Sequence, residues 1–369
     1  MRYLLVLLLW RPLPATLIPG PNLAQRIESA GAIVTGKLVH GTTLASGDQV
    51  SSDFVLRVDR VLKGNLLVGT EIPAHLEGRG IFNEPASKPR AIPPMFGIWF
   101  LSTGPQPYGV ISRDGAVGEI YFAPVILPEE APPGKPGTTP AASVANEMIS
   151  ALQWLAAQPK DQGQFPTLAE DFRTLAPADT LPAYRQFVRE DSPRLRAFGI
   201  AGLIAAGEPE GVIQAADQWN DLAAAADLSF IIVSLMSYAN EDPAGTSAVA
   251  SLALREGAAA GLRENAVYAL RAIHTREALP ALVALLDDPS ERVQPYALSG
   301  LCLFVRNGPP VTPQSVPSLS WMQSRQPAPL LTHETERYCS LGGKIANPEA
   351  YASFWKSWWN QHRAGIEGR

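Results

Sequence analysis

Runs of Lys and Arg are absent from this chain of 369 residues. Its 30 basic residues are outnumbered by 35 acidic ones, which gives a formal net charge of −5. Binding to nucleic-acid phosphates requires a concentrated basic face. The sequence therefore predicts no nucleic-acid partner. With 46% hydrophobic and 18% charged residues, the composition is typical of a globular protein with a sizeable core.

Apolar runs long enough to cross a membrane are also absent, because a spanning helix needs about 20 apolar residues. The best apolar run, Tyr3–Trp10, follows a basic second residue at the N-terminus. A charged start before a short apolar core is typical of a secretory signal. We predict a signal peptide over residues 1–24, cleaved between Ala15 and Ala24. A basic residue and a proline interrupt the pattern, so a mis-assigned start or a short interfacial segment are the alternatives.

Cysteine is scarce, with Cys302 and Cys339 as the two copies. Two cysteines supply neither a disulfide scaffold nor a zinc site. If the protein is exported to the periplasm, the cell envelope or the medium, these two residues can pair and tie the last repeat helix to the tail. If the protein is cytoplasmic, they are ordinary thiols.

Catalytic and metal-binding motifs are missing as well. The five histidines form no H-E-x-x-H motif and no cluster with metal-ligand spacing. The chain also lacks a G-x-S-x-G motif and a phosphate-binding loop. We interpret the nearest approach to a site, formed by His333, Glu334 and Glu336, as a solvated charged turn. The sequence predicts no catalytic residue, no metal site and no cofactor.

Proline, by contrast, is abundant, and its densest cluster divides the chain. Six of the 34 prolines fall within residues 124–140. Proline cannot continue a regular helix or an inner strand. We therefore predict a proline-rich linker over residues 125–140 that separates two domains.

Residues 28–124 show the patterns of β-structure. Phe54, Leu56 and Val58 alternate with less apolar neighbours, which is the period of a half-buried strand. Asp114-Gly115 favours a hairpin turn. Five or six short strands are expected in this segment, and they predict a small all-β barrel or sandwich.

After the linker, a pattern of apolar and small residues recurs every 31 to 34 residues. Similar helices are predicted to start at four apolar residues, Leu195, Leu228, Leu262 and Val293. In three of these units a second helix follows in phase. Two-helix units of this length are typical of α-solenoids, so we predict helical repeats over residues 141–308.

Two turns between the predicted repeats are alike. Each places a serine, Ser192 or Ser290, before a helix, where its side chain can cap the backbone. Each also carries a carboxylate pair, Glu190-Asp191 or Asp287-Asp288. We expect these carboxylates to be solvated and to complement the helix N-terminus.

Leu262–Ile273 resembles the first helix of a HEAT-type repeat, in the short bacterial form also seen in phycobilin-lyase-like proteins. The Asp-Pro turn before Val293 is similar to the inter-repeat turn of that family. The resemblance covers about residues 180–308 and implies an armadillo-like α-solenoid. HEAT arrays bind many unrelated partners, so no particular partner follows. Bilin ligation finds no specific residues in this chain.

Residues 28–124 more faintly resemble the small OB-like barrels of exported proteins. Members of that group similar to tissue inhibitors act through an N-terminal cysteine. This chain has none there, so the resemblance does not imply protease inhibition.

The C-terminal region, residues 309–369, is predicted to be irregular until a final helix begins near Pro348. That helix carries an aromatic stripe at spacings of three and four, formed by Tyr351, Phe354, Trp355, Trp358 and Trp359. One interpretation is a cap that seals the open end of the solenoid. The other is an exposed platform for a partner, with Tyr351, Trp355 and Trp358 as binding residues.

These observations together favour a non-enzymatic, exported interaction scaffold that binds a protein or peptide on the solenoid surface. The alternative is an extracytoplasmic enzyme or enzyme accessory with a site between the β-domain and the solenoid. A structural envelope protein without a discrete ligand would have the same sequence features as the scaffold.

Overall fold

The computed structural model describes residues 21–46, 49–79, 89–104, 106–111, 124–158, 163–225, 243–273, 276–307, 332–339 and 347–367. The chain divides into two compact units. Unit 1 comprises residues 1–151 and 170–175, and unit 2 comprises residues 152–169 and 176–369. Three sequence predictions lie outside the described residues: the signal segment as far as residue 20, the hairpin at Asp114-Gly115 and the first helix of the repeat that starts at Leu228.

Unit 1 contains a mixed β-sheet preceded by a short helix, α1 (Leu23–Ser29). The strands are β1 (Ala32–Ser46), β2 (Gln49–Lys63), β3 (Glu71–Arg79), β4 (Arg90–Ala91), β5 (Met95–Leu101), β6 (Tyr108–Gly109) and β7 (Val125–Ile126). Their order is β6-β3-β2-β1-β5-β7, with β4 beside β1. The pair β3–β6 is parallel and the other pairs are antiparallel. Val110, next to β6, bridges Leu101 of β5, so the hydrogen bonds close the sheet on itself.

The closed sheet surrounds a hydrophobic core that the sequence alternation predicts. Phe54, Leu56 and Val58 point into this core from β2, and Trp99 joins them from β5. The indole N–H of Trp99 donates to the backbone oxygen of Gly36 at 3.0 Å, which satisfies its polar group inside the core. The predicted N-terminal all-β part, followed by a helical region, is confirmed.

The proline-rich segment lies within unit 1, and not between the two units. It begins with β7, which pairs with β5, and continues along α2 (Pro140–Ala156). Four side chains of α2 hydrogen-bond to its backbone, namely Ser143, Asn146, Glu147 and Ser150. Gly134 approaches α2 so closely that a Cβ there would lie 2.4 Å from the Asn146 backbone. This segment is packed structure, which differs from the predicted linker.

Unit 2 is helical. Its helices, some shared with unit 1 at their ends, are α3 (Gln164–Arg173), α4 (Pro177–Phe187), α5 (Pro193–Ala205), α6 (Pro209–Ala225), α8 (Pro243–Ala253), α9 (Ala260–Ala272), α10 (Leu279–Ala284), α11 (Val293–Asn307), α12 (His333–Arg337) and α13 (Pro348–Glu367). The 3₁₀ turns η2 (Arg276–Ala278) and η3 (Leu285–Asp287) flank α10. Helix α12 lies in a segment predicted to be irregular, which corrects that prediction locally.

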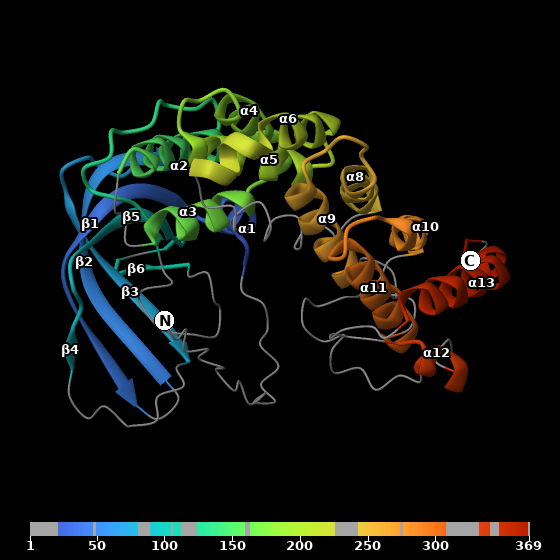
Figure 1. The fold of residues 1–369 in the computed structure, drawn as a ribbon. Coiled ribbons are helices and arrows are strands. Elements are labelled where there is room, and N and C mark those ends of the chain that lie inside the picture. The colour runs from blue at the N-terminus through green and yellow to red at the C-terminus, as the bar shows by residue number, and fades with distance from the viewer. Residues whose placement is uncertain are drawn as a thin grey trace, which may run out of the picture. The chain divides into compact units, whose positions relative to one another are not determined.

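The predicted repeats correspond to this order of helices. The first helices α5, α9 and α11 contain or begin at the predicted starts Leu195, Leu262 and Val293, and the second helices are α6, α8 and α10. Within this set α5 packs against α6, α8 against α9 and α9 against α11 (Figure 1). Ser192 caps α5 as predicted, because its hydroxyl accepts the Leu195 N–H. Ser290 differs, since its hydroxyl accepts the N–H of Arg292, which precedes α11.

Candidate functional site

The aromatic residues of α13 are predicted to form a cap or a platform. Most of their side chains are buried by packing within the chain. The helix contacts α10 and α11, which form the last described repeat. Trp355 is fully buried, and Trp358 packs edge-on against it at a ring-centroid distance of 5.3 Å. Tyr351 remains half-buried and packs edge-on against Tyr338. The indole rings of Trp355 and Trp358 are therefore packed within the chain, and a binding role for Tyr351, Trp355 and Trp358 stays a prediction.

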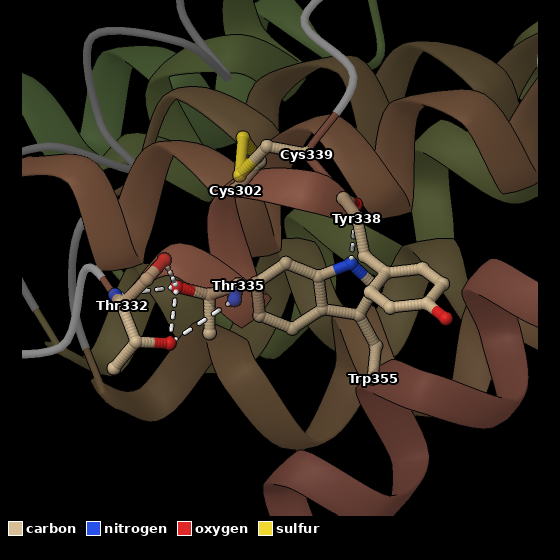
Figure 2. The surroundings of a disulfide bond; sticks show 6 residues. All are labelled: Cys302, Thr332, Thr335, Tyr338, Cys339 and Trp355. Carbon is tan, nitrogen blue, oxygen red and sulfur yellow. Dashed lines mark hydrogen bonds between the residues drawn. A yellow bond between two sulfur atoms is a disulfide. The ribbon is translucent and has the colours of Figure 1, made fainter.

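A disulfide joins Cys302 of α11 to Cys339, the residue that follows the α12 region (Figure 2). In the same view the indole nitrogen of Trp355 points at the backbone oxygen of Tyr338 and donates to it at 3.0 Å. Helix α12 begins with a capping box in which Thr332 and Thr335 exchange hydrogen bonds. The disulfide and the indole hydrogen bond therefore fix adjacent residues of one segment to α11 and α13.

Of the two carboxylates in the turn before α11, Asp288 does not have the solvated role predicted for it. The side chain of Asp288 is 5% exposed and forms an ion pair with Arg263 of α9. The same carboxylate accepts the Ser290 N–H at 2.9 Å, which holds the turn. Asp287 is exposed and bonds to Lys356 of α13. The prediction was wrong for Asp288, because a buried carboxylate must be paired.

Arg263, Asp288 and the helices between them outline one complete two-helix unit, from α9 through α10 to the turn before α11. Residues 262–288 match the PBS lyase HEAT-like repeat. No curated protein and no solved structure matches the chain. The HEAT-like match covers one repeat, and it agrees with the resemblance stated from Leu262–Ile273. It establishes the repeat type and assigns no ligand or activity.

Unit 1 contains a cavity that the sequence did not reveal. It lies on the outer face of the sheet, beneath the proline-rich segment and α2, and its volume is about 240 Å³. Its walls comprise Thr35, Asp59, Arg60, Phe96, Leu127, Pro128, Glu129, Ala131, Pro132, Pro133, Glu147 and Ala151. Most of these are apolar, and a few polar groups stand among them. Such a composition is typical of small-molecule sites.

A β-bulge presents two opposite charges at this cavity. Thr35 pairs with Arg60 and Gly36 pairs with Val58, which leaves Asp59 as an extra residue in β2. Val58 and Val61 both pack in the core, so Asp59 and Arg60 between them face the outer side together. In a regular strand, neighbouring residues would point to opposite faces. Bulges of this kind commonly redirect side chains beside functional sites.

Glu147 is the most deeply buried charged group of the cavity, with a side chain 6% exposed. One carboxylate oxygen accepts from Arg60, and the other accepts the Gly134 N–H at 3.0 Å. Burial raises the pKa of Glu147 above its ordinary value, although the Gly134 N–H and the Arg60 charge act in the opposite direction. Glu147 therefore positions Arg60 and the proline-rich segment, and removing its charge from water costs free energy.

The raised pKa of Glu147 predicts a pH-dependent stability. The folded state holds this proton more tightly than the unfolded state, so the free energy of unfolding falls as pH rises through the raised pKa. Glu147→Gln removes this titration. From about pH 4 upward, as the pH rises through the raised pKa, we expect wild type to lose more stability than the variant. Denaturant unfolding across this range measures the difference.

Glu130→Gln serves as the matched control, because Glu130 is an exposed carboxylate in the same segment and does not line the cavity. Its pH profile should follow that of wild type. An equal or steeper loss in Glu147→Gln would contradict the burial of this charge.

No three His, Cys, Asp or Glu side chains converge as a metal site within the described ranges. Among the histidines that the structure describes, His75 bonds to Asp53 at 2.6 Å on the sheet, and His333 lies exposed at the start of α12. Among the helices that the structure describes, none has the length and apolar content needed to cross a membrane.

Proposed function

We propose that this protein is an exported interaction scaffold that binds a protein or peptide on the surface of its second helices. The supporting observation is the HEAT-like repeat with helices stacked on both sides of it. Repeats of this type bury one face against neighbouring repeats and leave an extended surface for partners. The function is not enzymatic in this proposal.

Large apolar side chains on or next to the second helices are also exposed to solvent. In the described part of unit 2, the large hydrophobic side chains that remain exposed are Ile213 of α6, at 47%, and Leu254, at 44%. Leu254 directly follows α8, which packs against α6. Asp217 of α6 reaches Arg255, the next residue, at 3.9 Å. A surface that offers both apolar side chains and a charged pair suits a peptide that contains both apolar and charged residues.

Site-specific crosslinking tests this surface. A photoreactive residue at Ile213 or Leu254, in native cells, should give adducts with a defined protein. Two exposed positions provide controls: Arg292, before the first helix α11, and Leu67, in the turn after β2 of unit 1. Adducts at all four positions, or at Leu67 alone, would contradict the proposed surface.

Export is the second part of the proposal. The Cys302–Cys339 disulfide is consistent with an oxidising compartment, where such bonds persist. Cell fractionation with N-terminal sequencing tests it. We expect a mature protein outside the cytoplasm that starts between residues 15 and 25. Recovery from the cytosol alone, with Met1 intact, would rule export out.

A further inference from the structure

The cavity of unit 1 offers opposite charges side by side, together with a buried hydroxyl that has no partner. Thr35 is 2% exposed, and its Oγ1 has no hydrogen-bond partner among the residues that the structure describes. An unpaired buried hydroxyl costs free energy, and native proteins rarely leave one unused. Thr35 lies directly opposite Arg60 in the β1–β2 register. The hydroxyl and the guanidinium therefore border the same space.

The Arg60 guanidinium has N–H donors without an acceptor among the described residues. One of its terminal nitrogens donates to Glu147, and no other hydrogen bond from its guanidinium is formed with the described residues. Because Glu147 is itself held by the Gly134 N–H, the guanidinium is fixed at one edge and open at the other. A planar guanidinium with a free edge suits a carboxylate, which accepts two parallel hydrogen bonds.

Asp59 supplies the complementary charge. The bulge places it next to Arg60 on the outer face, yet within the described residues it forms no ion pair with Arg60 or any other cation. A carboxylate in this position favours an ammonium group. The ligand best matched to the pair carries both charges close together.

Apart from Glu147 and from Glu129, whose carboxylate pairs with Lys37 at 2.8 Å, the remaining walls are apolar and set the size. Phe96, the neighbouring Leu127 and three prolines of the covering segment line the cavity. A volume of about 240 Å³ suits a small metabolite. Prolines lose little conformational entropy when they form such a wall. The cavity can therefore hold a compact apolar group.

We propose that this cavity binds a small zwitterion of the free α-amino acid class with an apolar side chain. Its carboxylate lies against the free edge of Arg60 and accepts from the Thr35 hydroxyl, and its ammonium lies against Asp59. The side chain packs between Phe96 and the proline-rich segment. Glu147 is a positioning residue, which orients Arg60. This site belongs to unit 1 and does not depend on the proposed partner of the repeats.

Calorimetric titration of the full chain with L-valine, L-leucine and L-phenylalanine tests the proposal. At least one should bind saturably, with a Kd below about 1 mM. Two truncated probes follow, isocaproate without the ammonium and isoamylamine without the carboxylate. Each should bind at least about tenfold more weakly than L-leucine, because one charge-assisted contact is lost. Absence of saturable binding of all three amino acids up to about 10 mM, or equal binding of L-leucine and both truncated probes, would overturn the proposal.

Two variants test the contact to the ligand ammonium and the contact to the ligand carboxylate separately. Asp59→Asn should weaken L-leucine about tenfold and leave isocaproate unchanged. Thr35→Val should weaken the binding of L-leucine and of isocaproate, which both carry the carboxylate, without lowering the melting temperature, because it removes an unpaired hydroxyl. Glu130→Gln, outside the cavity, should bind as wild type does. Unaltered L-leucine binding in Asp59→Asn and Thr35→Val would refute the assigned contacts.

Discussion

Reducing the disulfide between Cys302 and Cys339 is expected to lower the free energy of unfolding of unit 2 by about 4 kcal/mol. The bond joins Cys302 of α11 to Cys339, two residues after α12, across a sequence separation of 37 residues. A cross-link over this span restricts the unfolded chain, and that restriction stabilises the folded state. For a helical unit of this size, the melting temperature should fall on the order of 10 °C.

Calorimetric melting with and without reductant measures this effect. The double variant Cys302→Ala, Cys339→Ala should have the same melting temperature as reduced wild type, and adding reductant should not change it. Coincident melting of oxidised and reduced wild type would show that the cross-link does not restrain unit 2. The contacts of α13 would then hold the C-terminal segment without the disulfide.

The features predicted well from the sequence are those whose signal is local and periodic. Alternation at Phe54, Leu56 and Val58 identified the core face of β2, because one buried face imposes a period of two. The small and apolar residues after Leu262 identified a first repeat helix, because neighbouring first helices pack closely. Neither inference requires knowledge of a distant partner.

The proline-rich segment shows that local sequence patterns do not predict how a segment packs against a distant helix. Its prolines exclude regular structure, so a linker was the natural expectation. Its backbone still needs hydrogen-bond partners when it is packed. The partners are one polar stripe of α2, whose members are Ser143, Asn146, Glu147 and Ser150. This stripe, on the helix that also carries the buried Val144 and Met148, was the available signal for a packed segment.

The cavity was beyond sequence reasoning because its polar groups depend on register. Asp59 and Arg60 share a face only because a bulge separates Val58 from Val61. The bulge in turn needs Gly36 on β1, where a Cβ would lie 2.4 Å from the Arg57 oxygen. No local pattern reports such a pairing. Asp288 was misjudged for a similar reason, since its partner Arg263 lies on the preceding first helix.

Replacing Trp355 by Ala is expected to cost about 3–5 kcal/mol of unfolding free energy. The indole is fully buried and packs between Phe354 and Trp358. Its removal leaves a cavity beneath the disulfide-bearing segment and deprives the Tyr338 oxygen of its donor. Trp355→Phe keeps most of the ring but loses the donor, so it should fall between wild type and the alanine variant.

The same experiment decides between the two interpretations of α13. Gln361→Ala, on an exposed part of this helix, should change stability by no more than about 0.5 kcal/mol and controls for the effect of any substitution there. If the helix is a cap, Trp355→Ala and Trp358→Ala should lower the melting temperature of the repeats themselves, because α10 and α11 lose the surface that covers them. Variants that keep the wild-type melting temperature but lose a partner would instead make the stripe a platform, since a side chain that stabilises nothing within the chain is free to serve binding.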